Sequence, residues 1–123
     1  MYSLSVKRHF DSAHKLSGYD GKCNRLHGHS FIVEATVEGD LLNSINMIID
    51  FSLLKKGMDS IIEEYLDHYY LNETLQEENP TAEYLAKWIY DEMKEGISFM
   101  GLKLTKVMIW ESPDCCAGYS EVE

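Results

Sequence analysis

The spacing of apolar residues changes along the chain, and this change restricts the possible folds more than any other feature of the sequence. Residues 1–16 and 29–38 alternate apolar and polar positions, which is the pattern of a half-buried β-strand. One face of the first strand carries Tyr2, Leu4 and Val6 and, if no bulge intervenes, Phe10, Ser12 and His14. Residues 17–25 are rich in Gly, Asp and Asn, as loops are, so we predict a long antiparallel hairpin.

Beyond residue 50 the spacing becomes that of a helix. An amphipathic helix is predicted over about residues 52–66, because Leu54, Met58, Ile61, Ile62 and Tyr65 fall at helical spacing. A second helix opens at Asn79-Pro80-Thr81, with Asn or Thr as its cap, and Gly96 lies near its end. Its buried residues are Ala82, Leu85, Ala86, Ile89 and Met93. A third strand is predicted over residues 104–110, and residues 116–122 offer a fourth.

The order strand, strand, helix, helix, strand, strand (ββααββ) predicts an α+β fold. In such a fold the two helices pack on one face of a four-stranded antiparallel sheet. The chain has 123 residues, two prolines and no Gly/Ser-rich stretch, so we expect residues 1–123 to form a single domain.

The charge of the chain disfavours some partners. The 11 basic and 21 acidic residues give a net charge of −10, which repels the phosphates of nucleic acids and of anionic membranes. No apolar run approaches the ~18–20 residues of a membrane span, and residues 1–10 lack the apolar core of a signal peptide. The adjacent cysteines Cys115 and Cys116 are a poor basis for a disulfide framework and are expected to be packing thiols. We therefore expect a cytoplasmic protein with reduced thiols.

Three of the five histidines are predicted to meet at one end of the hairpin. His27 and His29 are two residues apart on a strand and share a face, and Gly28 between them lets the backbone pass closely. His14, near the end of the first strand, can supply a third imidazole. Three neutral imidazoles leave one position of Zn²⁺ open to water or substrate, as in catalytic zinc sites. The alternative is that His27 and His29 are two polar residues on a solvated strand face.

Cys23 lies four residues before His27, and two interpretations of it stay open. As a fourth ligand it would close the site and make the zinc structural. As a free thiol beside the cation it would have a lowered pKa, and its thiolate would be suited to proton transfer.

Two further carboxylates are candidates for a role in a site. Asp67 directly precedes His68, and a carboxylate that orients an imidazole fixes its tautomer and stabilises its protonated form. The alternative is a surface pair near a helix end. Glu111 follows the apolar run of the third strand. It is either solvated or, beside a cleft, able to accept two hydrogen bonds from a guanidine-like edge of a ligand.

Five blocks of the sequence resemble those of the 6-pyruvoyl-tetrahydropterin synthase superfamily, and they occur in the family's order. They are Phe10-Asp-Ser-Ala-His14-Lys-Leu, Cys23-x-x-x-His27-Gly28-His29, Ile49-Asp50-Phe51, Leu66-Asp67-His68-x-x-Leu71-Asn72 and Asn79-Pro80-Thr81-x-Glu83. The three residues between Cys23 and His27 resemble the spacing in the bacterial 6-carboxy-5,6,7,8-tetrahydropterin synthases of queuosine biosynthesis. The animal pyruvoyl enzymes typically have a longer insertion there, and a folate-pathway branch has glutamate in place of the cysteine.

The resemblance implies the tunnelling fold and a role for each candidate residue. The implied zinc ligands are His14, His27 and His29. Cys23 would be the catalytic base, Asp67 with His68 would complete the proton transfer, and Glu111 would bind the 2-amino and N3 hydrogens of a pterin. Members of the family assemble as dimers of trimers, which implies a homohexamer with active sites at subunit interfaces. The tail after Glu111 is variable, so contacts to the pterin beyond this residue are left open.

The reaction implied by the resemblance is the zinc-dependent conversion of 7,8-dihydroneopterin triphosphate to 6-carboxy-5,6,7,8-tetrahydropterin, with release of acetaldehyde and triphosphate. The alternatives are a 6-pyruvoyl-tetrahydropterin synthase, which eliminates triphosphate without cleaving the side chain, and a non-catalytic zinc-stabilised binding module. The charge allows a triphosphate, because residues 1–29 have five basic and two acidic residues, a net +3, whereas the remaining six basic and 19 acidic residues give −13. We expect Lys22 or Arg25 to contact the triphosphate.

Overall fold

The two alternating segments at the start of the chain form long strands that pair along their whole length. In the computed structural model, which describes residues 1–18, 20–21 and 24–121, β1 (Tyr2–His14) pairs antiparallel with β2 (His27–Gly39). The register runs without a shift from the first residue of β1 to its last, which lies opposite His27. The hairpin prediction is therefore confirmed, and no bulge interrupts the inward-facing side of β1.

The sheet is completed by β3 (Lys103–Ser112) and β4 (Cys115–Tyr119), and its strand order is β1-β2-β3-β4 with all neighbours antiparallel. The strand β2 begins at residue 27, two residues earlier than predicted, because His27 pairs with the end of β1. The predicted fourth strand over residues 116–122 is shifted: it begins at Cys115 and ends at Tyr119, which is the last residue to pair with β3.

Residues 51–99, all of which the structure describes, form four helices where two were predicted. Helix α1 (Phe51–Ile61) is capped by Asp50, whose carboxylate accepts the Ser52 N–H at 2.8 Å. It continues directly into the π-helix η2 (Ile62–Leu66), so the predicted helix over residues 52–66 changes its winding in the last five residues. Helix α2 (Leu71–Thr74) has four residues, too few for a periodic pattern to predict it.

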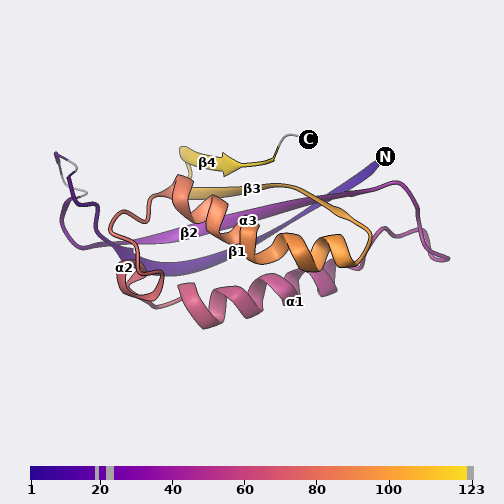
Figure 1. Cartoon of the computed structure of the whole chain (residues 1–123), viewed down its shortest axis with the longest axis horizontal. Coiled ribbons are helices and arrows are strands. Elements are labelled where there is room, and N and C mark those ends of the chain that lie inside the picture. The colour runs from indigo at the N-terminus through magenta and orange to yellow at the C-terminus, as the bar shows by residue number, and fades with distance from the viewer. Residues whose placement is uncertain (19, 22–23, 122–123) are drawn as a thin grey trace.

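The fourth helix, α3 (Ala82–Phe99), begins where the sequence signal placed it. The Thr81 hydroxyl accepts the Tyr84 N–H at 3.1 Å, so Thr81 and not Asn79 is its cap. Helices α1 and α3 cover one face of the sheet, as Figure 1 shows. The predicted α+β architecture, four antiparallel strands with helices on one face, is thus confirmed.

The core lies between α1, α3 and the inward face of the sheet. Apolar side chains at alternate positions of the strands are buried there, and the rings of Phe10 and Phe31 stack at 5.2 Å between centroids. The same alternation places Ser12 and His14 on the inward face, where both are buried. The imidazole of His14 is fully buried, and a buried polar group is costly unless it has a partner.

The segment after η2 lies against the outer edge of β1. The Ala13 N–H donates to the Tyr69 carbonyl at 3.0 Å, and the His68 N–H donates to the Asp11 carbonyl at 2.6 Å. Ala13 and Tyr70 form a parallel bridge. Residues 67–70 therefore extend the sheet by a short stretch at the end that carries His14.

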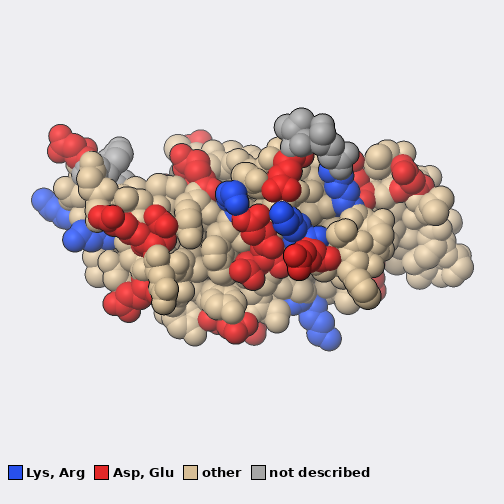
Figure 2. Space-filling view, viewed as in Figure 1, with Lys and Arg blue, Asp and Glu red and all other residues tan. Residues whose placement is uncertain are grey.

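Acidic side chains are spread over the face seen in Figure 2, as the net charge of −10 requires. Some basic side chains lie at the end of the molecule where the loop between β1 and β2 lies, beside acidic ones, and others lie in the middle of this face. None of the helices in the described part of the chain is long and apolar enough to cross a membrane.

Candidate metal centre

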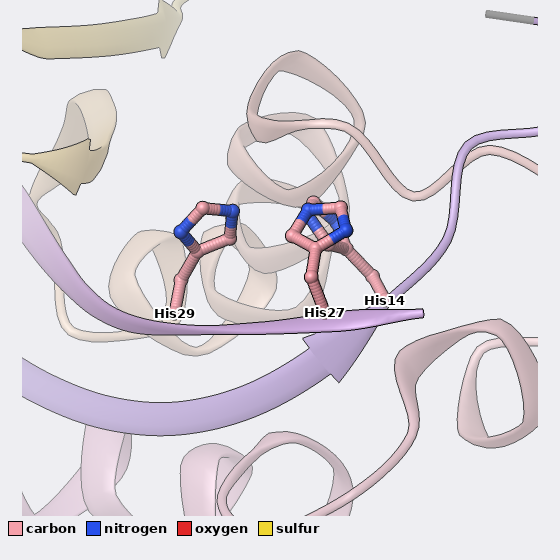
Figure 3. Close-up of side chains that lie close together, drawn as sticks. All are labelled: His14, His27 and His29. Carbon is pink, nitrogen blue, oxygen red and sulfur yellow. The ribbon is translucent and has the colours of Figure 1, made fainter. Parts of the chain in front are cut away.

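Three histidines from β1 and β2 converge on the inward side of the sheet. His14 lies opposite His27, and Ser12 lies opposite His29, so the register puts all three imidazoles on one face. The ring centroids are 4.5, 4.8 and 5.1 Å apart, and one ring nitrogen of each lies within 4.8 Å of the others. Figure 3 shows the rings standing on the same side of their two strands.

In two of these imidazoles, a backbone carbonyl determines which ring nitrogen carries the hydrogen and which has a free lone pair. His14 Nδ1 is 2.8 Å from the Pro80 carbonyl, and His27 Nδ1 is 2.7 Å from the Arg25 carbonyl. A carbonyl only accepts, so each Nδ1 carries the hydrogen and each Nε2 has a free lone pair. Metal-binding histidines commonly make this arrangement with their second nitrogen.

The Nε2 atoms of His14, His27 and His29 are buried and have no hydrogen-bond partner among the described residues. Three buried polar atoms without partners are costly unless something occupies the space between them. A divalent cation satisfies all three at once, and imidazole suits zinc and several other transition metals. The donor set therefore fits a metal with three protein ligands.

The protonation of the site also favours a metal. Burial lowers the pKa of His14 from its ordinary value, outweighing the hydrogen bond to the Pro80 carbonyl, and burial likewise lowers the pKa of His29. The charge of Glu111 raises both pKa values, but it does not overcome burial. Neutral imidazoles are the form that binds a metal, so binding one requires little proton release from His14 and His29.

Glu111 lies beside the histidines and lines a cavity of about 740 Å³. The cavity lies between the start of α3 and strand β4, and its other walls are Leu16, Thr81, Ala82, Glu83, Cys115, Cys116, Ala117 and Gly118. Cys115 and Cys116 are exposed free thiols, so their prediction as packing thiols is wrong. The reason is that β4 is the edge of the sheet and most of its side chains face this open cavity or solvent.

Asp67 and His68 lie at the outer edge of β1, in a second cluster with Asp11. His68 and His29 nevertheless line the same cavity, of about 560 Å³. His68 Nδ1 is 3.0 Å from one Asp67 oxygen, and the other Asp67 oxygen accepts the Asp11 N–H at 3.0 Å. The hydrogen bond from the Asp11 N–H is the main cause that lowers the pKa of Asp67. Burial opposes it, and the contact with His68 lowers the pKa further. The His68 side chain is 77% exposed and its backbone has a φ of +64°, a conformation that non-glycine residues rarely adopt.

Two of the candidate residues, Lys22 and Cys23, lie outside the described residues. Arg25 is described: its side chain is exposed, and its carbonyl accepts the hydrogen bond from His27. The sequence did not predict that the Asp11 N–H binds the Asp67 carboxylate or that the Pro80 carbonyl binds His14. Both contacts use backbone atoms, for which the residue type gives no signal.

Comparisons with known proteins give one family. The family model described as 6-pyruvoyl tetrahydropterin synthase matches residues 3–122. A 6-carboxy-5,6,7,8-tetrahydropterin synthase of Synechocystis sp. is 44% identical over an alignment of 99 residues, and the match covers 77% of this chain and 77% of the relative. A dihydroneopterin monophosphate aldolase of Pyrococcus furiosus is 35% identical over 102 residues, which cover 83% of this chain and 82% of the relative.

A solved structure gives the same result for the fold. The 6-pyruvoyl tetrahydropterin synthase of Caenorhabditis elegans superposes with a TM-score of 0.84 at 26% identity. The superposition covers 98% of this chain and 96% of the other.

Proposed function

Because the chain belongs to the 6-pyruvoyl tetrahydropterin synthase family, we propose that it converts 7,8-dihydroneopterin triphosphate and water to 6-carboxy-5,6,7,8-tetrahydropterin, acetaldehyde and triphosphate, in queuosine and related 7-deazapurine biosynthesis. The observation that carries the proposal is the convergence of three buried, unpartnered Nε2 atoms beside the Glu111 cavity. The relative that is 44% identical bears the name of this activity, which supports the choice of product.

The metal in this proposal is Zn²⁺, held by His14, His27 and His29. When bound, it supplies Lewis acidity, which makes the C–H bonds next to the side-chain oxygens of the substrate more acidic. The chain itself contributes the orientation of the ligands, through the carbonyls of Pro80 and Arg25.

Proton transfer is assigned to residues at two places. The Cys23 thiolate would accept a proton from the substrate side chain, and His68 would act as the partner acid. The contact of His68 with Asp67 supports this role, because a carboxylate on Nδ1 fixes the tautomer and stabilises the protonated ring. His68 is exposed at the edge of β1, which supports an active site completed by a second chain of the homohexamer.

Recognition of the substrate is assigned to the two sides of the metal centre. The Glu111 carboxylate, half-buried in its cavity, would accept hydrogen bonds from the 2-amino and N3 hydrogens of the pterin. Lys22 or Arg25 would contact the triphosphate. The exposed side chain of Arg25 and the net charge of +3 over residues 1–29 support an anion there.

The substitution Cys23→Ala tests the assignment of the base. We expect a loss of kcat of about 10²–10⁴-fold, because general acid–base catalysis contributes that much, while the zinc content stays at that of the unchanged protein. Turnover is followed by acetaldehyde release and zinc by elemental analysis. Loss of the metal in this variant would identify Cys23 as a ligand and contradict its role as base.

Product analysis separates the proposed reaction from its alternatives. A 6-pyruvoyl-tetrahydropterin synthase would release triphosphate but no aldehyde. The relative named dihydroneopterin monophosphate aldolase favours a second candidate, an aldol cleavage that would leave phosphate on the two-carbon aldehyde. A zinc-stabilised binding module would turn over no pterin. Acetaldehyde and triphosphate in equal amounts from dihydroneopterin triphosphate support the proposal, and any of the other outcomes contradicts it.

A further inference from the structure

Asn72 connects the two segments that determine the position of His14. It is the second residue of α2, and its side chain reaches the chain directly after β1. Its Oδ1 accepts the Lys15 N–H at 3.0 Å, and its Nδ2 donates to the Lys15 carbonyl at 2.8 Å. The same Nδ2 donates to the Glu78 carbonyl at 3.0 Å. One amide group therefore holds the residue after His14 and the residue two before Pro80.

This connection matters because His14 and Pro80 are hydrogen-bonded to each other. The Pro80 carbonyl receives the His14 Nδ1–H, and both residues are fully buried. The direction of that bond sets the orientation of the imidazole, and thereby points Nε2 toward the Nε2 atoms of His27 and His29. A change in the distance between Lys15 and Glu78 would move the donor and the acceptor of this bond relative to each other.

The chemistry of the three contacts requires an asparagine. One acceptor meets an N–H, and two donors meet carbonyl oxygens, so an amide satisfies all three. A carboxylate of the same size would keep the contact to the Lys15 N–H but would face two carbonyl oxygens without a hydrogen to donate. Alanine would remove all three contacts.

We propose that Asn72 is a positioning residue for the metal centre, which holds the His14 imidazole and its Pro80 partner in the geometry that binds the ion. The inference rests on the metal centre of the proposed function, but not on the reaction. It adds a residue in the segment between η2 and α3 to a site whose ligands all lie on β1 and β2.

The test compares zinc affinity in Asn72→Ala and Asn72→Asp with that of the unchanged protein. Substitution of partners behind metal ligands typically costs 10–100-fold in affinity, so we expect the zinc dissociation constant to rise at least about tenfold in both variants. It is measured on the folded apoprotein by competition with a chelator.

We also expect the visible spectrum of the Co²⁺-loaded protein to change, because that spectrum reports ligand geometry, which a purely structural role would not alter. Asn72→Asp keeps the volume of the side chain, so the test can be made with this variant alone if Asn72→Ala does not fold.

Asn43 provides the matched control. Its Oδ1 accepts the N–H groups of Ile45 and Met47 at 3.0 and 3.1 Å, in the loop between β2 and α1. Asn43→Ala therefore also removes contacts from a side chain to the backbone, and Asn43→Asp adds the same charge, without touching the segments of His14 and Pro80. Both are expected to leave zinc affinity unchanged.

The outcomes separate this inference from the proposed function. The positioning role alone is overturned if both Asn72 variants bind zinc with an affinity within threefold of that of the unchanged protein and give the same Co²⁺ spectrum. A different result is that the unchanged protein binds zinc but releases no acetaldehyde. If zinc affinity then still falls in the Asn72 variants, the result supports the positioning role and contradicts only the reaction. An unchanged protein that binds no zinc overturns both.

Discussion

At the scale of single residues, a hydrogen bond on one nitrogen of an imidazole decides what the other nitrogen can do. The carbonyls of Pro80 and Arg25 hold the hydrogens of His14 and His27 on Nδ1. The free lone pairs therefore lie on the Nε2 atoms, where the register of the strands brings them together. Asp67 holds the hydrogen of His68 on Nδ1 in the same way, but here the acceptor is a charged carboxylate rather than a carbonyl. Its own charge is stabilised by the backbone of β1.

The depressed pKa of Asp67 predicts how Asp67→Asn depends on pH. A carboxyl group whose pKa is lowered by folding stabilises the folded state above its unfolded pKa of about 3.9, and this stabilisation is lost as the pH falls through the folded pKa. We expect Asp67→Asn to reduce the free energy of unfolding by about 1 kcal/mol at pH 7, with the gap closing below about pH 4. Urea unfolding at pH 7 and pH 3 measures it.

The control for this prediction is Glu63→Gln, which removes an exposed carboxylate from η2. Its effect should be small at both pH values. A gap between Asp67→Asn and the unchanged protein that stays constant from pH 7 to pH 3 would show that the charge of Asp67 does not contribute to stability.

At the scale of elements, β1 links the two clusters of candidate residues. Its inward face ends in His14, and the backbone of Asp11, three residues earlier, holds both the Asp67 carboxylate and the His68 N–H. The start of α3 is the second important element, because Pro80 directly precedes the cap of this helix. The end of β1 and the start of α3 therefore meet at His14.

The cap of α3 gives a prediction for this element. Thr81→Ala removes the acceptor for the Tyr84 N–H, which is one of the N–H groups in the first turn that have no partner inside the helix. We expect the free energy of unfolding to fall by about 1 kcal/mol, and Thr81→Ser to restore most of it, since serine is an equally good cap. Urea unfolding of the three proteins measures this. Equal midpoints for Thr81→Ala and the unchanged protein would show that the cap does not stabilise the helix.

At the scale of the whole molecule, the candidate metal centre joins segments that are far apart in the sequence. His14 and His29 come from the two arms of the hairpin, whereas Pro80 lies between α2 and α3 and Glu111 lies in β3. A ligand that holds the hairpin end together binds the folded chain only. Metal binding is therefore expected to stabilise the entire fold rather than one loop.

Zinc should raise the free energy of unfolding of the whole chain. At a free zinc concentration a hundredfold above the dissociation constant, the expected gain is about 2.7 kcal/mol. His27→Ala should lose this gain, whereas His9→Ala, which removes an exposed histidine of β1 outside the cluster, should keep it. Unfolding with and without a chelator measures both, and an equal gain in His27→Ala would contradict the assigned ligands.

Much of the fold could be predicted, because apolar spacing records which side of each element is buried. The alternation in the first forty residues predicted the hairpin and the shared face of Phe10 and His14, and the spacing of Leu54 and Met58 predicted α1. The short helix α2 and the π-helix η2 could not be predicted. Four residues make no period, and the wider winding of η2 is a matter of backbone hydrogen bonds, such as that from the Asp67 N–H to the Ile62 carbonyl, which apolar spacing does not record.

The sequence by itself determined the candidate residues: histidines two apart on a strand share a face whatever the rest of the chain does. Only the tertiary structure decided that the Nε2 atoms face one another and lack partners, that Asp67 and His68 lie at the outer edge of β1, and that Asn72 holds the segments of His14 and Pro80. The physical reason is that a residue's type records what its side chain can donate or accept. Which backbone carbonyl or N–H it meets depends on how distant segments pack.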